Sequence, residues 1–262
     1  MSVPTGAIRS ARRRVRQGIE ALPDDIRELA LALATRTTSG PTVLPGPPDG
    51  PVLVVAPHPD DEVIGPGATL ARHAEEGHEV RVLVCTSGGA TAGGGMDVTQ
   101  VREEESRRAL RQLGVDQPPR FGRLTDGALP EEAAALARLI QEHGRDVATV
   151  YVPSLLDHHP DHAAAARALA RTDLPDEVTV MGYEVWAAAP VNVLLDVTRV
   201  FARKQAALGE YLVALETVDY VRSASGLAAY RSAEGALGGR GFAEGFVQSS
   251  LAEYRSWVNL YP

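Results

Sequence analysis

The chain lacks the features that would tie it to an oxidising compartment, a membrane or a nucleic acid. Its one cysteine, Cys85, cannot form an internal disulfide. No N-terminal apolar run resembles a signal peptide, and no stretch approaches the roughly 20 apolar residues of a membrane span. The net charge of −8 argues against nucleic-acid and anionic-membrane partners. We therefore expect a cytoplasmic protein without an integral membrane segment and without a nucleic-acid partner.

The length and composition of the chain suit one large domain with an appendage. The 262 residues are 44% hydrophobic and 23% charged, as in an ordinary globular protein. The pattern within residues 1–40 predicts helix, and we interpret its arginine cluster between Arg9 and Arg16 as a solvated face. Prolines between Gly40 and Pro51 predict an extended linker. Residues 1–50 are thus expected to be a helical extension and linker, and residues 51–262 the main domain.

In the main domain, short apolar runs alternate with amphipathic stretches. The segment 52–56 is apolar on both faces, as a central parallel strand is. Further strands are predicted at 79–85, 149–152, 177–183 and 193–197, and helices at 66–76, 98–113, 130–143, 160–171 and 199–215. This alternation predicts an α/β, Rossmann-like fold with a mostly parallel sheet flanked by helices. In such sheets ligands bind beyond the carboxyl ends of the strands.

A histidine and three acids, Pro57-His-Pro-Asp-Asp-Glu62, directly follow the first of these strands. Packing alone does not account for them, because close like charges repel and are costly to bury unpaired. A bound cation would remove this cost, because it attracts the carboxylates that otherwise repel one another. His58 and Asp61 can face one ion, since Pro59 bends the chain between them, and an imidazole and a carboxylate are normal zinc ligands. Asp60, if left outside the ligand shell, is free to act as a base.

A second cluster, Asp157-His-His-Pro-Asp-His162, follows the strand predicted to end at residue 152. Pro160 suits the first turn of a helix, and His159 and His162 can lie on one face of that turn. His162 would complete a set of three ligands, which leaves one position open for water, as a catalytic zinc site requires. Asp161 can hydrogen-bond an adjacent imidazole and fix its tautomer or charge. Either cluster alone is usually a turn, but two at strand ends of one sheet indicate metal catalysis with one Zn²⁺ per chain.

At these residues the chain resembles a known family. Val54-Val-Ala-Pro-His-Pro-Asp-Asp-Glu-Val-Ile-Gly65 and His159-Pro-Asp-His162 look like the two signature motifs of the LmbE/PIG-L family of zinc-dependent N-deacetylases. The resemblance covers roughly residues 51–246, and includes Arg102-x-x-Glu105, Tyr183-Glu184-x-Trp186 and Lys204. It implies that the metal ligands are His58, Asp61 and His162. It also implies that Asp60 is the general base, and that His159, supported by Asp161, polarises the scissile carbonyl or stabilises the oxyanion.

The resemblance implies a hydrolase that removes an N-acetyl group from an amino sugar or a glycosylated small molecule, such as a natural-product or thiol-cofactor intermediate. Arg102, Glu105 and Glu184 are candidates for contacts with sugar hydroxyls, or equally for paired groups away from the substrate. Two positions depart from the family and bear on the substrate. Gly89 stands where an acidic residue often follows Thr-x-Gly, and Asp157 stands where thiol-precursor deacetylases often have a tyrosine. The expected partner is a small N-acylated glycoside, and the sequence leaves a homo-oligomer open.

Two other functions stay open, a zinc amidase for a larger acyl group or a thiol-conjugate amide, and a non-catalytic sugar-binding or scaffold protein. Asp60 and His159 speak against the second, since binding alone needs neither. A dinucleotide site is disfavoured, because Gly65-Pro-Gly lacks the third glycine and carboxylates stand where pyrophosphate would sit. Ser87 lacks the Gly-x-Ser-x-Gly elbow of a nucleophile, and Cys85 is interpreted as a small core residue.

Overall fold

The computed structural model describes residues 23, 40–89, 98–234 and 237–259. The helix predicted within residues 1–40, with its arginine cluster, lies outside the described residues, apart from Pro23 and Gly40. The helices and strands are, in chain order, β1 (Thr42–Leu44), β2 (Val52–Ala56), α3 (Asp61–Ile64), α4 (Gly67–Glu75), β3 (Val80–Thr86), α5 (Thr99–Leu113), β4 (Arg120–Leu124), α6 (Ala133–His143), β5 (Thr149–Pro153), α7 (Pro160–Ala170), β6 (Thr179–Tyr183), β7 (Val193–Asp196), α8 (Phe201–Leu208), α9 (Leu212–Leu215), α10 (Tyr220–Arg231), β8 (Ala243–Ser250) and α11 (Leu251–Val258).

One sheet of eight strands runs through the described part of the chain, in the order β1-β7-β8-β6-β5-β2-β3-β4. Strand β8 is antiparallel to both of its neighbours, β6 and β7. Every other pair of neighbouring strands is parallel. The predicted α/β fold with a mostly parallel sheet is therefore confirmed.

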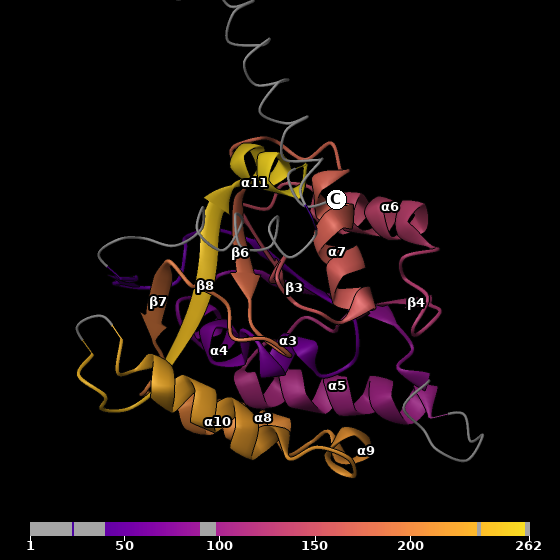
Figure 1. The fold of residues 1–262 in the computed structure, drawn as a ribbon. Helices are drawn as coiled ribbons and strands as arrows, with labels where there is room; N and C mark the ends of the chain where they lie inside the picture. The colour runs from indigo at the N-terminus through magenta and orange to yellow at the C-terminus, as the bar shows by residue number, and fades with distance from the viewer. Residues whose placement is uncertain (1–22, 24–39, 90–97, 235–236, 260–262) are drawn as a thin grey trace, which may run out of the picture.

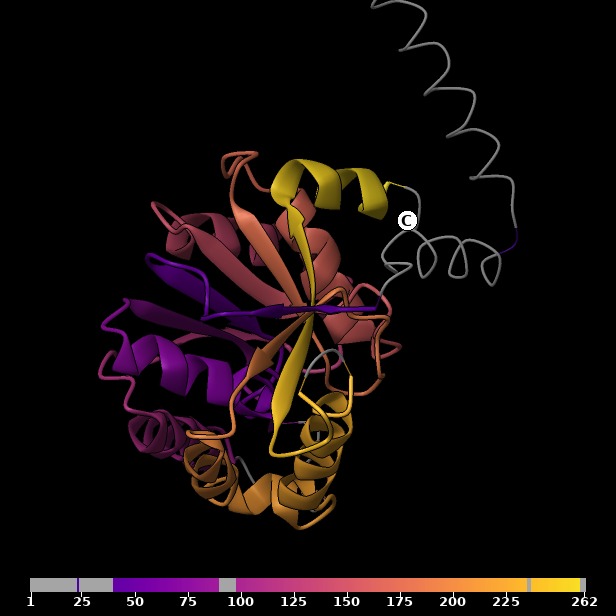
Figure 2. The ribbon, with the colours of Figure 1, turned by 90° about the vertical axis from the view of Figure 1, so that its left-hand side faces the viewer.

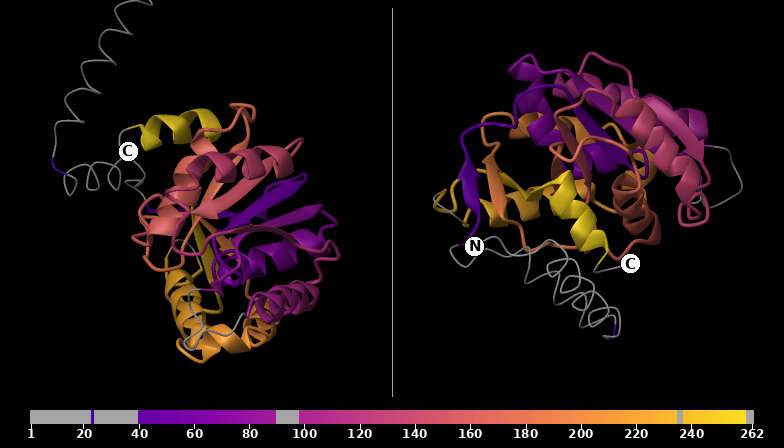
Figure 3. Two further views of the ribbon diagram at one scale, coloured as in Figure 1. Left: turned by 90° about the vertical axis from the view of Figure 1, so that its right-hand side faces the viewer. Right: turned by 90° about the horizontal axis from the view of Figure 1, so that it is seen from above.

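Helices cover both faces of this sheet (Figure 1). Helices α4, α5, α8 and α10 pack on one face, and α6, α7 and α11 pack on the other. The two layers are seen along other directions in Figure 2 and Figure 3. Alternate residues of β2 point to opposite faces, so Val54 joins the first core and Val55 the second. Because both faces are covered, the whole of β2 is buried and apolar.

The structure differs from the sequence pattern at a few elements. The pattern does not predict β4, a half-exposed strand at one edge of the sheet whose sequence is rich in polar residues. Nor does it predict β8, which brings Glu244 into the protein interior. The helix expected over 199–215 is two helices, α8 and α9, and Gly209, a weak helix former, follows the first of them. Strand β1 lies in the segment expected to be a linker, where it pairs with β7.

The two clusters meet at one edge of the sheet. Strand β2 pairs in parallel with β5 on one side and with β3 on the other. The chain turns away from β2 in opposite directions along the sheet, toward β3 and β4 on one side and β5 and β6 on the other. Such a switch in strand order opens a crevice at the carboxyl ends. Residues 57–62 and 157–162 leave β2 and β5 at this crevice. Within the described residues, no helix is long and apolar enough to cross a lipid bilayer.

Candidate metal centre

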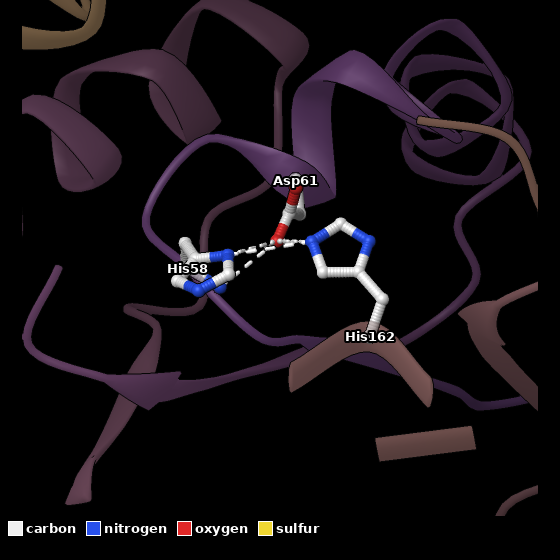
Figure 4. Close-up of side chains that lie close together, drawn as sticks. All are labelled: His58, Asp61 and His162. Carbon is white, nitrogen blue, oxygen red and sulfur yellow. Dashed lines mark hydrogen bonds and ion pairs between the residues drawn. The ribbon is translucent and has the colours of Figure 1, made fainter. Parts of the chain in front are cut away.

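Three side chains from the two clusters point toward one another (Figure 4). Oδ2 of Asp61 lies 3.2 Å from Nδ1 of His58 and 3.2 Å from Nε2 of His162. These two nitrogens are 3.3 Å apart. In a tetrahedral zinc site with bonds of about 2.1 Å, neighbouring donor atoms are roughly 3.4 Å apart. The triangle of donors therefore fits a metal ion of this size, and these residues could hold one.

Carboxylates hold the outer nitrogens of both histidines. Nδ1 of His162 lies 3.0 Å from Oδ2 of Asp157. Nε2 of His58 lies 3.2 Å from Oδ2 of Asp161 and 3.2 Å from Oδ1 of Asp126. A carboxylate behind a ligand imidazole fixes its ring orientation and tautomer and makes it a stronger ligand. The inner nitrogens, Nδ1 of His58 and Nε2 of His162, are thereby left as the donors.

His159 and Asp161 are fixed by the first turn of α7. His159 is the N-cap residue, and its Nδ1 accepts a hydrogen bond from the backbone N–H of Asp161 at 3.2 Å. In the neutral ring the proton therefore sits on Nε2. The carboxylate of Asp161 is held in turn by the backbone N–H groups of Gly127, at 2.8 Å, and Leu129, at 3.0 Å. The His159 ring lies beside the donor triangle, with its centroid 4.9 Å from those of His58 and His162.

Asp60 adopts a backbone conformation that non-glycine residues rarely show, with φ 138° and ψ −29°. Such a conformation is strained and persists only where its surroundings enforce it. Oε2 of Glu62 accepts the backbone N–H of Asp60 at 2.9 Å. Nη2 of Arg102 donates to the carbonyl of Pro59 at 2.8 Å and to Oδ2 of Asp60 at 3.1 Å. These contacts fix the Asp60 carboxyl, which lines a cavity together with Asp61.

The electrostatics of the site favour a cation. Burial raises the pKa of Asp60 to about 8, and the neighbouring charge of Asp61 adds to this against the opposing effect of Arg102. Burial lowers the pKa of His162, but Asp61 and Asp157 outweigh it and raise that pKa to about 9. Asp60 thus holds a proton tightly chiefly because it is buried, and His162 does so because two carboxylates face its ring. A metal ion can take the place of such protons, since it binds the deprotonated ligands.

A cavity of about 280 Å³ lies against the donor triangle. Its volume is close to the lower limit for pockets that hold small molecules. Its lining residues come from both clusters, α5, the loops after β4 and β6, and the segment from α9 to α10: His58, Asp60, Asp61, Arg102, Asp126, Gly127, His159, Trp186, Ala214, Thr217 and Tyr220.

The four residues expected near the substrate lie in different places. Arg102 lines this cavity, with Nη1 donating to the carbonyl of Gly88 at 2.7 Å as well as to the groups around Asp60. Asp157 is buried and accepts hydrogen bonds from the backbone N–H groups of His159, at 3.0 Å, and Trp186, at 3.2 Å, besides its contact with His162. Gly89, the other position that departs from the family, is exposed.

Glu105 and Glu184 are not among the residues that line this cavity. Glu105 is buried on α5, where Oε1 accepts the backbone N–H of Val213 at 3.2 Å. Glu184 is buried and forms an ion pair with Arg231 of α10. It lines a second cavity beside the first.

Asp126 and Tyr220 are among the residues of the cavity wall that the sequence did not indicate. Asp126 follows β4, the edge strand that the pattern does not predict. The Asp126-Gly127 pair is a common turn signal and could have marked this loop. Tyr220 begins α10, where no motif marks it.

Known proteins resemble this chain in sequence and in fold. A family model described as PIG-L, GlcNAc-PI de-N-acetylase, matches residues 53–172, which contain both clusters. YaiS, an uncharacterized deacetylase of Escherichia coli strain K12, is 33% identical over 141 residues, or 51% of this chain and 72% of that protein. A conserved protein from Thermus thermophilus, whose crystal structure is known, superposes with a TM-score of 0.62 at 29% identity. That superposition covers 75% of this chain and 93% of the other.

Other relatives carry a more specific name. A 1D-myo-inositol 2-acetamido-2-deoxy-alpha-D-glucopyranoside deacetylase of Mycolicibacterium vanbaalenii is 32% identical over 146 residues, or 44% of this chain and 51% of that protein. The chain spans about half the length of this and similarly named curated relatives. Tyr220 and Arg231 lie beyond the residues that the family model matches.

Proposed function

Because this chain belongs to the PIG-L family, described as GlcNAc-PI de-N-acetylases, we propose that it is a metal-dependent N-deacetylase. It would remove an acetyl group from the nitrogen of an amino sugar or of a glycosylated small molecule. One observation carries this proposal. Asp60, His159 and two members of the donor triangle, His58 and Asp61, line one cavity large enough for a sugar-sized group, and His162 completes the triangle behind them.

The metal is proposed to be one Zn²⁺ per chain, bound by His58, Asp61 and His162. Two imidazoles and one carboxylate, with an open fourth position, are a common ligand set for catalytic zinc. When bound, such an ion lowers the pKa of a water molecule and polarises a carbonyl oxygen. The other tasks of amide hydrolysis fall to side chains of the chain itself.

Asp60 is proposed to take the proton from the attacking water. Arg102 holds its Oδ2, which leaves Oδ1 to accept that proton. The strained backbone keeps the carboxyl beside the donor triangle without making it a ligand. A base positioned in this way contributes typically 10²- to 10⁴-fold to a rate.

His159 is proposed to stabilise the negative charge that develops on the carbonyl oxygen. Its Nδ1 is occupied by the N–H of Asp161, so Nε2–H is the free donor. A fixed donor of this kind stabilises an oxyanion without having to reorganise. As a C–O bond forms to the water oxygen and the C–N bond breaks, Asp60 or His159 returns a proton to the nitrogen. The products are acetate and the free amine.

A zinc amidase that cleaves a larger acyl group is the second candidate. The observation in its favour is the second cavity, of about 240 Å³, which shares Trp186 and Tyr220 with the first. Acetate release compared with release of longer acids from the same amino sugar separates the two candidates.

The test of the proposed function is metal analysis combined with an acetate-release assay. The panel contains N-acetylamino sugars, N-acetylated glycosyl thiols and glycosylated antibiotics. We expect about one zinc per chain and acetate release from at least one member. The Asp60→Asn variant should keep its metal and lose turnover by about 10²-fold or more. No metal and no release from any member would contradict the proposal. Binding of a sugar without release would favour the non-catalytic sugar-binding protein instead.

A further inference from the structure

The second cavity lies behind the wall that carries Trp186 and Tyr220. These two side chains line both cavities, and their rings meet edge to face with centroids 6.0 Å apart. Trp186 is 42% exposed. The pair therefore stands between the candidate metal centre and the second cavity.

Much of the second cavity's wall is aliphatic. It is lined on one side by the α10 residues Ala224, Leu227 and Ala228, and on another by Ile64 at the end of α3. Most of its lining residues lie beyond the segment that the family model matches. The cavity is therefore built mainly by parts of the chain outside the two motifs.

The first charged pair in the cavity wall is Lys204 and Glu244, and both side chains make their hydrogen bonds to other groups of the protein. Nζ of Lys204 donates to the carbonyl of Ile64 at 2.7 Å, to that of Gly65 at 2.8 Å and to Oε1 of Glu244 at 2.6 Å. An ammonium has three hydrogens, so none is left for a ligand. The other carboxylate oxygen of Glu244 accepts the backbone N–H of Thr69 at 2.7 Å.

The second charged pair is also occupied. Nε and Nη2 of Arg231 both donate to the carboxylate of Glu184, and Nη2 donates further to the carbonyl of Ala189. Nη1 of Arg231 binds Glu234. Arg231 and Glu184 are buried. A charged ligand in this cavity would lose its water shell and find these wall charges already neutralised, which is unfavourable.

We propose that the second cavity is a subsite for an uncharged, apolar group of the substrate. Its volume of about 240 Å³ accommodates roughly eight heavy atoms, at about 30 Å³ for a group the size of a water molecule. This inference rests on the proposed function, because it places the reacting amide in the first cavity. The apolar group is either the acyl chain on the nitrogen or the aglycone of the sugar. Both sources share the same chemistry.

Two substrate series distinguish the sources. One varies the acyl group of N-acylglucosamine from acetyl to hexanoyl, and the other varies the aglycone of alkyl N-acetylglucosaminides from methyl to hexyl. If the cavity binds the acyl chain, kcat/KM should rise in the first series, and if it binds the aglycone, kcat/KM should rise in the second. The expected rise is about three- to fourfold per added methylene until the cavity is full. A flat response in both series would overturn the proposal.

Variants on one helix test whether this cavity causes the rise. Ala228→Leu fills the cavity and should abolish the rise. Ala229→Leu adds the same bulk on the exposed side of α10 and should leave the whole series unchanged. Leu227→Ala enlarges the cavity and should shift the preference toward longer chains. An unchanged series in both cavity variants would contradict the proposal.

A binding measurement makes the inference independent of turnover. The chain has two tryptophans, so Trp257→Phe leaves Trp186 as the only fluorescent indole. With chelator-treated protein, 1-hexanol should change this fluorescence saturably, and hexanoate, its charged counterpart, should not. Ala228→Leu should remove the response to hexanol. Hexanol binding without acetate release would refute the proposed function alone. Acetate release without hexanol binding, or equal binding of hexanoate, would refute the subsite alone.

Discussion

Asp60 and Glu62 are joined by a hydrogen bond from the backbone N–H of the first to Oε2 of the second, at 2.9 Å. Glu62 is fully buried, and its other oxygen accepts hydrogen bonds from Tyr211, at 2.8 Å, and from Ser106. This hydrogen bond helps to stabilise the strained backbone conformation of Asp60, because it satisfies a backbone N–H that is buried in the protein interior. The carboxylate of Glu62 thus positions the proposed base while lying outside the cavity.

Replacing Glu62 by alanine should lower kcat by about tenfold or more and leave KM nearly unchanged, because the Asp60 carboxyl loses its fixed position. A tenfold change corresponds to about 1.4 kcal/mol in the barrier. Glu62→Gln keeps an oxygen that can accept the Asp60 N–H and should lie between the alanine variant and the wild type. Tyr211→Phe keeps the bond to Asp60 and should stay within a few-fold of wild type. Wild-type kcat in a folded Glu62→Ala protein would refute this positioning role.

Asp157→Asn should weaken zinc binding by about 10- to 100-fold, because the asparagine no longer presents a carboxylate to Nδ1 of His162. Competition with a chromophoric chelator measures the affinity. Asp116→Asn, an exposed aspartate, is the control and should bind zinc as the wild type does. If Asp157→Asn instead kept its zinc affinity and raised KM, Asp157 would belong to the substrate site, as the family resemblance implies.

Arg231→Gln should lower the free energy of unfolding by about 3–5 kcal/mol, because it leaves the buried carboxylate of Glu184 without its cation. Adding Glu184→Gln should restore much of this loss, since the unpaired charge is then gone. Urea denaturation measures both, with Arg222→Gln on the exposed side of α10 as the control. Equal losses in the single and double variants would show that packing, and not the buried charge, sets the effect.

His73 should make the fold less stable in mild acid. It is buried on α4, with Nε2 2.8 Å from the hydroxyl of Tyr151 and Nδ1 2.9 Å from Nδ1 of His78. Burial lowers the pKa of His73 from 6.5 to about 3, and the charges of His78 and Arg72 contribute. Between these values the unfolded chain binds a proton that the folded chain does not. The free energy of unfolding therefore falls with pH below about 6.5, by up to about 1.4 kcal/mol per pH unit.

Urea midpoints between pH 7.5 and 5, measured with chelator so that metal loss does not contribute, test the role of His73. His73→Gln should be less stable than wild type at pH 7.5, and the difference should shrink as the pH falls. His158→Gln, at an exposed position, should keep the wild-type slope. If the urea midpoints of wild type and His73→Gln fell equally with pH, the proposed contribution of His73 to the pH dependence of stability would be ruled out.

The sequence predicts those parts of the site that are contiguous in the chain. His58 to Glu62 and Asp157 to His162 each follow a buried apolar strand, and parallel strands bring their ends together. The family resemblance is confirmed, and the donor triangle contains the three residues it names. Asp126 and Tyr220 are missed because their places depend on β4 and α10, whose packing no local pattern encodes.

The sequence also leaves open what a polar residue faces. Arg102 stands three residues before Glu105 on one helix, and the same motif suggested sugar contacts for both. Tertiary packing separates them, because Arg102 reaches the cavity wall at Asp60 while Glu105 binds the backbone of α9. Glu184 differs again, since its partner Arg231 is distant in the chain. A spacing rule gives neighbours on a helix but cannot say which neighbour meets a ligand.

Acetate release by chelator-treated protein, measured while zinc is added back, tests the central claim most directly. The substrate is whichever N-acetylated glycoside of the panel the untreated protein cleaves. We predict that treated protein releases no acetate and that activity rises linearly to a plateau at one zinc per chain. His162→Ala, which removes one donor, should show no plateau at that ratio. Full acetate release by metal-free protein would contradict the account.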